Sequence, residues 1–259
     1  MTAINLSGGV ILVTGGSGSI GGATAVELAR AGAAVVVADV SMEACLAVVE
    51  TIRATGGSAS AARIDVRDAD SLTQAIETAT AELGPLTGLV NAAGILRVSR
   101  IEEMKESDWN DIQSVNVLGT FLATKAAIPF LKAAGGGTIV NISSVSAYIG
   151  SDGGAAYSAT KGAVLSFTYG AAGELAPDRI RVNAVCPGWV DGGFTHQAMA
   201  DAEDPEALAD SARSLHYLGR MATATDVGNA VTWLSSDLAA FITGTALFVD
   251  GGFMIKRGC

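Results

Sequence analysis

The strongest constraint on the fold of this chain is an alternation of short β-branched runs with longer segments rich in Ala, Leu and Glu. Most of the short runs are apolar throughout, as expected of strands that helices cover on both sides. Repeated strand–helix–strand units predict right-handed crossovers and an α/β fold, a doubly wound parallel sheet of about seven strands with helices on both faces. The predicted strands are 10–13, 34–38, 59–64, 88–91, 138–142, 180–185 and 247–249, and the predicted helices are 20–31, 42–54, 69–83, 107–133, 155–176 and 224–236.

One stretch interrupts this alternation. From Pro187 to about Arg220, Pro, Gly and acidic residues replace the regular pattern. A structureless loop of this length is usually a lid or a binding loop. No linker or change of composition divides the chain elsewhere, so we expect a single domain over 1–259 with a flexible substrate lid at about 188–220.

Composition excludes several classes of protein. A formal net charge of −10 with no basic cluster argues against nucleic-acid binding. Cys45, Cys186 and Cys259 are widely separated and have no metal-ligand spacing, which predicts neither a disulfide framework nor a metal site. The charge-free first 26 residues lack a basic segment and are interrupted by glycines, unlike a signal peptide. Residues 238–249 are too short a run to span a bilayer. We therefore expect a cytoplasmic protein that binds no membrane.

A glycine-rich turn follows the first predicted strand. Residues 14–21 read TGGSGSIG and lead into a helical Ala/Leu pattern. Backbone N–H groups at a helix N-terminus attract a pyrophosphate, and glycines let the backbone approach it. The sequence therefore predicts nucleotide binding by Gly15, Ser17, Gly18, Ser19 and Ile20; the alternative is a flexible turn.

Asp39 ends the second predicted strand, 18 residues after Gly21. A carboxylate at this position accepts hydrogen bonds from an adenosine ribose and repels a 2′-phosphate. Gly16 and Val40 flank the predicted ribose site and supply no cation for such a phosphate. This pattern favours NAD over NADP. The alternative is that Asp39 only begins the turn before the next helix.

Tyr157 and Lys161 lie four residues apart in a predicted helix, so they share one face. A free Tyr has a pKa of about 10, too high for an efficient base at neutral pH, and a nearby ammonium group would lower that pKa. The alternative is a surface Tyr beside a solvated Lys. The remaining motifs decide between the two.

Seven segments occur in the order found in the short-chain dehydrogenase/reductase family. They are residues 14–21, NAAG at 91–94, Asn116, ISS at 142–144, YSATK at 157–161, PG at 187–188 and VDGG at 249–252. Ser144 precedes Tyr157 by thirteen residues. The whole chain thus resembles the compact, single-domain members of this family. The resemblance implies a Rossmann fold that binds a nicotinamide nucleotide and interconverts alcohols and ketones.

The resemblance also implies a role for each residue. Tyr157 would be the general acid/base, Lys161 would lower its pKa and hold the nicotinamide ribose, Ser144 would bind the substrate oxygen, and Asn116 would order a water that relays protons to Lys161. Taken singly, these polar residues also fit a strand end, a helix position or a cap. Further cofactor contacts are implied at Asp65, Val66, Asn91, Gly94, Pro187, Gly188 and Val190. Relatives of this kind form homotetramers, which we expect here.

Two positions depart from the family pattern. Its usual TGxxxGxG places glycine at position 19, where this chain has Ser19. A Thr commonly meets the nicotinamide amide at position 192, where this chain has Gly192. The turn fits TGxxGxxG instead, the spacing of larger sugar-nucleotide-modifying relatives, but 259 residues do not easily house their extra substrate region.

Leu96, Val145, Trp189 and Phe194 predict an apolar substrate pocket. The predicted function is an NAD(H)-dependent oxidoreductase that interconverts a small secondary alcohol and a ketone. The alternatives are a catalytically silent nucleotide-binding regulator, which would not need the four catalytic residues together, and a ketoreductase resembling 3-oxoacyl-thioester reductases. A hydrolase is excluded because only His196 and His216 are present, both in or near the lid, and no GxSxG occurs. A lone His in a lid is most often a solvated loop residue; the alternative for His196 is contact with the substrate.

Overall fold

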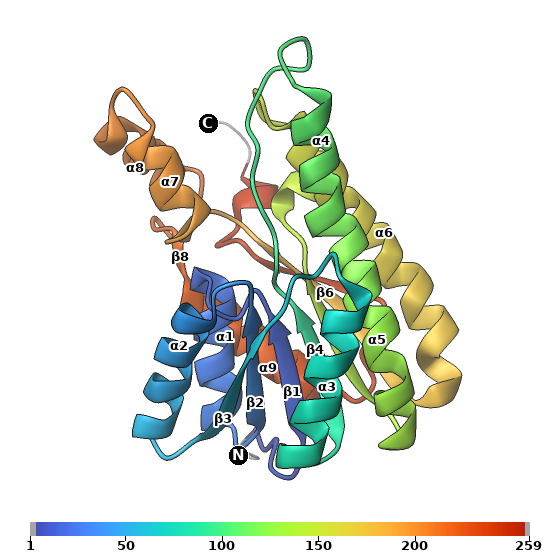
Figure 1. Cartoon of the computed structure of the whole chain (residues 1–259). Coiled ribbons are helices and arrows are strands. Elements are labelled where there is room, and N and C mark those ends of the chain that lie inside the picture. The colour runs from blue at the N-terminus through green and yellow to red at the C-terminus, as the bar shows by residue number, and fades with distance from the viewer. Residues whose placement is uncertain (1–3, 257–259) are drawn as a thin grey trace.

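The computed structural model describes residues 4–256 and arranges them around a seven-stranded parallel sheet (Figure 1). The strand order is β3-β2-β1-β4-β5-β6-β9, so the predicted doubly wound α/β fold is confirmed. The strands are β1 Val10–Thr14, β2 Ala34–Asp39, β3 Ser58–Arg63, β4 Leu86–Asn91, β5 Gly137–Ile142, β6 Ile180–Pro187 and β9 Ala246–Val249. Cys259 lies outside the described residues.

Helices cover both faces of the sheet because successive strand residues alternate between two apolar layers. Ile11 and Val13 of β1 pack with α1 Ser19–Arg30, α2 Met42–Ala54 and α9 Ala224–Ser235. Val10 and Leu12 pack on the other face with α3 Ala69–Leu83, α5 Gly119–Ala133 and α6 Ala155–Leu175. This two-sided burial explains why the strands read as continuous apolar runs.

The helix predicted at 107–133 is a composite of three parts. It comprises α4 Glu106–Gln113, a π-helical turn at Ser114–Leu118, and α5. By length and composition alone Glu106–Ala133 would pass for a membrane span, yet α5 packs on β4, β5 and α3 as a core helix. Single π-helical turns inside helices occur frequently at functional sites, and this one carries Asn116.

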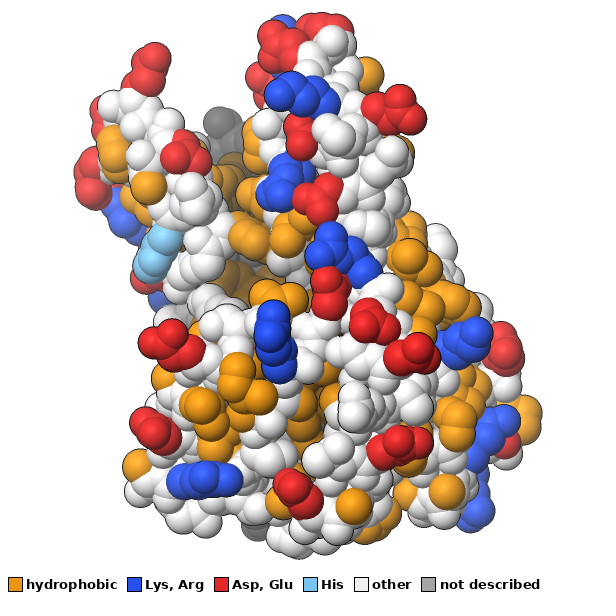
Figure 2. Space-filling view, in the orientation of Figure 1, with side chains coloured by type: hydrophobic (Ala, Val, Ile, Leu, Met, Phe, Trp, Pro, Cys, Tyr) orange, Lys and Arg blue, Asp and Glu red, His pale blue; other side chains and the backbone are white. Residues whose placement is uncertain are grey.

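The stretch 187–220 is not the structureless loop that the sequence predicted. It contains β7 Val190–Asp191, α7 Phe194–Ala200 and α8 Pro205–Ser214, and β7 pairs with β8 Ala222–Thr223. Helix α8 starts at Pro205 and is capped by the Asp204 side chain, a start signal that the acidic composition concealed. Helices α7 and α8 project from the body opposite α4 (Figure 1). Figure 2 shows the surface hollowed between these two projections, with hydrophobic side chains in the hollow.

Short 3-10 helices complete the described chain. They are Val145–Ala147, Ala176–Asp178, Asp237–Ala239 and Phe253–Ile255. Helices α2, α3, α8 and α9 begin at polar side chains that cap them, such as Asp68 before α3 and the Thr223–Asp226 capping box before α9. Helix α1, like α6, has a glycine at its N-cap, and no side chain caps it.

Candidate active site

The predicted site residues gather at the carboxyl edge of the sheet, around the point where the strand order reverses. Strand β1 lies between β2 and β4, so the chain leaves β1 toward one side and returns to the other. In open α/β sheets this reversal leaves a crevice where ligands bind. The turn after β1, the end of β2 and the loops after β4, β5 and β6 all meet there.

The glycine-rich turn after β1 is shaped by its neighbouring loop. Gly15 has φ +64°, and a Cβ atom there would lie 2.5 Å from the backbone nitrogen of Ala93. Gly16 N–H donates to Ala38 O at 3.1 Å, which ties the turn to β2. We attributed these glycines to close approach by a phosphate; for Gly15 the close approach is to the protein backbone. Because no side chain caps α1, its first N–H groups remain free for an anion.

Asp39 is bound to the same turn. Its Oδ2 accepts hydrogen bonds from Ser17 N at 3.2 Å and Ser17 Oγ at 2.7 Å, and its Oδ1 accepts one from Val40 N at 2.7 Å. An ionised carboxylate has about four acceptor positions, so capacity for a further donor remains. Arg63, at the end of β3, is the register partner of Asp39. This neighbouring cation lies far from Asp39 in sequence, so the residues that flank Asp39 did not indicate it.

Asn116 and Lys161 face the same glycine. An atom at the Cβ position of Gly94 would lie 3.4 Å from Asn116 Oδ1 and 3.8 Å from Lys161 Nζ. Asn116 Oδ1 accepts from Ile95 N at 2.8 Å, and its Nδ2 donates to Ile95 O at 3.0 Å and Thr160 Oγ1 at 3.1 Å. The Asn116 amide therefore fixes the loop after β4 against α6, a structural task that the motif alone did not reveal.

Lys161 is buried, and its Nζ donates to Ile142 O at 2.8 Å. The same Nζ lies 5.5 Å from the centre of the Tyr157 ring. Burial lowers the pKa of Lys161 to about 8, because the charged form is deprived of water.

The expected lowering of the Tyr157 pKa is not found in the protein alone. Burial raises the pKa of Tyr157 above its usual value, and a hydrogen bond with Ser144 opposes this rise. The physical reason is that Lys161 donates to the Ile142 carbonyl and lies over the ring of Tyr157. Tyr157 is therefore a phenol at neutral pH, and its proton is available for donation.

Ser144 sits between β5 and α6. Its Oγ accepts from Ser146 N at 3.0 Å and caps the 3-10 turn Val145–Ala147. The preceding Ser143 donates through its hydroxyl to Lys161 O at 2.9 Å. These contacts fix the end of β5 against the helix that carries Tyr157 and Lys161, so the four predicted catalytic residues meet in one place.

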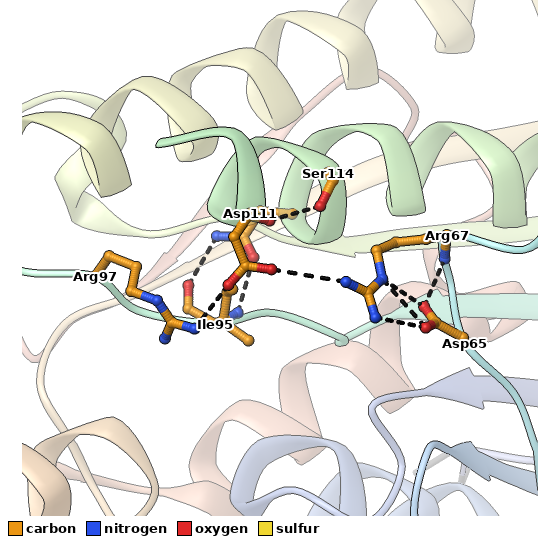
Figure 3. A network of polar contacts seen from close by, with 7 residues as sticks. Asp65, Arg67, Ile95, Arg97, Asp111 and Ser114 are labelled. Atoms are coloured by element: carbon orange, nitrogen blue, oxygen red, sulfur yellow. Dashed lines mark hydrogen bonds and ion pairs between the residues drawn. The ribbon is translucent and has the colours of Figure 1, made fainter. Parts of the chain in front are cut away.

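Charged side chains connect the predicted adenine side to α4 (Figure 3). Arg67 Nη2 lies 2.7 Å from Asp65 Oδ2, and this pairing lowers the pKa of Asp65. Arg67 Nη1 also lies 3.7 Å from Asp111 Oδ1, and Asp111 Oδ2 pairs with Arg97 Nη2 at 2.7 Å. Half-exposed pairs of this kind add little stability. These ion pairs instead hold the loop after β4 and the turn after β3 against one helix, α4.

The side chain of Asn91 has a structural role at the end of β4. Its side chain is buried, and its Nδ2 donates to Asn141 Oδ1 at 2.8 Å and to Thr124 Oγ1 at 3.2 Å. Asn141 Nδ2 in turn donates to Thr168 Oγ1 at 2.9 Å. This amide links β4 and β5 to the helices beneath, which leaves only the Asn91 backbone to face a cofactor.

Of the predicted pocket residues, Phe194 lies in contact with Tyr157. Phe194, the first residue of α7, packs edge-to-face on Tyr157 with ring centres 6.3 Å apart and planes at 87°. Val145 is buried, whereas Leu96 and Trp189 are partly exposed. An aromatic side chain of α7 thus lies directly against the expected acid/base.

His216 is a residue that the sequence analysis misread. We interpreted it as a solvated loop residue, yet it is buried. Its Nε2 lies 3.2 Å from Trp189 N, which donates to it, and its Nδ1 lies 2.8 Å from Ala212 O. A Cβ atom on Gly188 would lie 2.6 Å from His216 Nε2. His216 therefore joins the end of α8 to the turn after β6, whereas His196 is exposed and pairs with Asp191 at 2.7 Å.

Comparisons with known proteins agree with this geometry. A family model described as enoyl-(acyl carrier protein) reductase matches residues 15–254. Cyclopentanol dehydrogenase of Comamonas testosteroni is 40% identical over 244 residues, covering 94% of this chain and 96% of that protein. The 3-oxoacyl-[acyl-carrier-protein] reductase FabG of Thermotoga maritima is 34% identical over 252 residues, covering 97% and 100%. The crystal structure of gox2181 superposes with a TM-score of 0.91 at 31% identity and covers 98% of both chains.

Fold, site and relatives together define an oxidoreductase of the α/β class that uses a nicotinamide nucleotide. The chain belongs to the short-chain dehydrogenase/reductase family. The resemblance recognised from its motifs is thereby confirmed.

Proposed function

We propose that this protein is an NAD(H)-dependent dehydrogenase that interconverts a small secondary alcohol and its ketone, with Tyr157 as general acid/base. The observation that carries this proposal is the convergence of Asn116, Ser144, Tyr157 and Lys161 beside the turn that opens α1. A silent nucleotide-binding regulator has no need of that convergence. A bound nicotinamide dinucleotide supplies the site for hydride transfer.

The residues of the chain handle the proton. In ketone reduction the Tyr157 hydroxyl donates its proton to the carbonyl oxygen, and the Ser144 hydroxyl donates a hydrogen bond to the same oxygen. In alcohol oxidation Tyr157 must first lose its proton, so oxidation should accelerate as the pH rises. The Lys161 ammonium favours the charged form of Tyr157 when it comes near the phenolic oxygen.

The residues around α1 fit a dinucleotide. The uncapped α1 N-terminus offers N–H groups to a pyrophosphate, and Asp39 keeps acceptor capacity for ribose hydroxyls. The Asp39 carboxylate disfavours the 2′-phosphate of NADP, which supports a preference for NAD. We propose that Gly15, Ser17, Gly18, Ser19 and Ile20 contact the pyrophosphate side, Asp65 and Val66 the adenine side, and Gly94, Pro187, Gly188 and Val190 the nicotinamide side.

The substrate class follows from the apolar lining and from the relatives. Leu96, Val145, Trp189 and Phe194 supply no charge for a phosphorylated sugar. The relative from Sphingobium indicum, 39% identical over 253 residues, is a 2,5-dichloro-2,5-cyclohexadiene-1,4-diol dehydrogenase. Together with cyclopentanol dehydrogenase, this relative supports a small cyclic secondary alcohol. The similarity to FabG keeps a 3-oxoacyl-thioester ketoreductase as the second candidate.

An oxidation screen tests the proposal. Cyclic and open-chain secondary alcohols are offered with NAD⁺ and, separately, NADP⁺, and an acetoacetyl thioester is offered with NADH and NADPH. We expect turnover of cyclic alcohols with NAD⁺ at a kcat/KM at least tenfold above that with NADP⁺. Turnover of the thioester alone would establish the second candidate. Tight NADH binding without turnover of any compound would establish the regulator.

We further propose that residues 188–220 act as the substrate lid and that the protein is a cytoplasmic homotetramer. Exposed apolar side chains support subunit contacts. They lie at the start of α5 (Leu118 and Phe121) and around β9 (Tyr148, Phe241 and Phe248). Light scattering at micromolar concentration tests the assembly, and a monomer would refute it.

A further inference from the structure

The two positions at which the sequence departs from its family, Ser19 and Gly192, touch each other in the structure. A Cβ atom on Gly192 would lie 2.4 Å from Ser19 Oγ and 3.3 Å from Ser19 Cβ. Unbonded carbon and oxygen atoms do not remain at 2.4 Å, so a side chain at position 192 would force the Ser19 hydroxyl out of the position that it occupies. Gly192 also has φ +140°, a conformation that glycine adopts far more readily than other residues.

This contact lies at the start of the lid. Strand β7 ends at Asp191, and α7 begins at Phe194, so Gly192 and Gly193 alone connect them. The first turn of α7 is fixed to the same point, because Thr195 N–H donates to Gly192 O at 3.1 Å and the Thr195 side chain is buried. The position of residue 192 therefore determines where α7 begins.

The other end of this short segment touches the expected acid/base. Phe194 packs edge-to-face on Tyr157. Ser19 lies at the first position of α1, in the turn that faces the dinucleotide. Residues 192–194 thus connect the cofactor turn to Tyr157 by a continuous path of three residues.

We propose that Ser19 is a positioning residue for the substrate site. Its side chain fills the space beside Gly192 and seats the start of the lid, which holds the Phe194 ring against Tyr157. The inference rests on the proposed function, because it assigns Phe194 to the alcohol pocket. Ser19 and Gly192 are then a matched pair, in which the Ser19 hydroxyl can keep its present position only while residue 192 is glycine.

A change at position 19 should therefore act on the substrate more than on the cofactor. Ser19→Gly keeps the backbone N–H of residue 19 but leaves a gap beside Gly192. We expect the KM for the alcohol to rise at least threefold, and by a larger factor than the Kd for NADH, because the pyrophosphate keeps the backbone N–H of residue 19. A change confined to the NADH Kd or to thermal stability would show a cofactor-binding or merely structural role and would overturn the proposal.

A double-mutant cycle tests the contact itself. Ser19→Gly, Gly192→Ala and the double variant are compared with the parent, both in kcat/KM for the alcohol and in Tm without cofactor. The backbone strain of alanine at position 192 is present in both backgrounds and cancels in the cycle. We expect the loss of kcat/KM caused by Gly192→Ala to be at least fivefold smaller when residue 19 is glycine, and its Tm loss to be smaller as well.

Gly219→Ala is the matched control. Gly219 also has a positive φ, +69°, but nothing lies within 4 Å of its Cβ position. Its substitution should cost the same in both backgrounds. If Gly192→Ala behaves like this control, with equal losses within twofold, the proposal is wrong. If the parent binds no NADH and oxidises no alcohol, the proposed function fails, while the Tm cycle on the cofactor-free protein still decides whether the two positions are paired.

Discussion

Replacing Lys161 with methionine should stabilise the folded protein at neutral pH while removing its activity. The Lys161 side chain is buried, and burial lowers its pKa from 10.5 to about 8. At about 1.4 kcal/mol per tenfold change in proton affinity, keeping this ammonium group charged costs the fold about 3 kcal/mol at pH 7. Methionine has a similar length and no charge, and it fills irregular core space well.

One loss opposes this gain. Lys161 Nζ donates to Ile142 O, and leaving that carbonyl without a donor costs roughly 1–3 kcal/mol. The net expectation is an unfolding free energy about 1 kcal/mol higher than that of the parent at pH 7, at fixed protein concentration and without cofactor.

The pH dependence makes the test sharper. Below pH 8 Lys161 is charged in both the folded and the unfolded protein, so the folded protein bears the whole cost of burying this charge, about 3 kcal/mol. Between pH 8 and 10.5 the unfolded chain binds the proton that the folded protein has lost, so the contribution of Lys161 to stability rises with pH. Between pH 7 and 10 the unfolding free energy of the parent should therefore rise by about 2 kcal/mol relative to that of Lys161→Met, so the parent becomes the more stable protein by about 1 kcal/mol at pH 10.

Urea unfolding of both proteins at several pH values measures this difference, and titrations common to the two cancel. Cys186 is the titratable neighbour that interacts with Lys161. Burial raises the pKa of the Cys186 thiol, and the charge of Lys161 lowers it. Lys105→Met, at an exposed lysine, is the control, and its difference from the parent should not change with pH. A difference between parent and Lys161→Met that stays constant from pH 7 to 10 would refute the reasoning.

Three other substitutions probe separate parts of the site. Asp39→Ala should reduce the NAD preference in kcat/KM from at least tenfold to less than threefold, and an unchanged ratio would remove Asp39 from cofactor selection. His216→Leu leaves Trp189 N–H without an acceptor and should lower the unfolding free energy by about 2–4 kcal/mol. His196→Leu, at an exposed position, should change the unfolding free energy by less than about 1 kcal/mol. Equal effects of the two substitutions would contradict the structural role of His216 between α8 and the turn after β6. Asn116→Ala should lower both the Tm and kcat, because it releases Ile95 from α6; a normal Tm with reduced kcat would assign Asn116 to proton relay alone.

The sheet was predictable because its strands are buried on both faces and therefore read as separate apolar runs. The candidate site residues came from the resemblance to the family, and the structure brings them together because the carboxyl ends of parallel strands lie at one edge of the sheet. What escaped prediction depends on packing between distant segments. The π-helical turn at Asn116 carries no distinctive local signal, and α7 and α8 are short, polar helices that resemble loop sequence.

Side-chain direction escaped prediction for the same reason. Asn91 belongs to a cofactor motif, yet its amide turns into the core toward Asn141. His216 is separated by 27 residues from Trp189, the residue it binds, so its burial could not be read from neighbours in sequence. The departures at Ser19 and Gly192 were both visible in the sequence, but only the structure shows that they are in contact.

The central claim is that Tyr157 transfers the proton that accompanies hydride transfer. Tyr157→Phe removes only the phenolic oxygen and keeps the ring that packs on Phe194, so the fold and NADH binding should persist. The decisive measurement is turnover of this variant with an alcohol that the parent oxidises, alongside a titration of NADH binding. We predict a normal Kd for NADH and a loss of turnover of roughly 10²–10⁴-fold. Normal NADH binding with turnover within about threefold of the parent would contradict the assignment of Tyr157 as the acid/base.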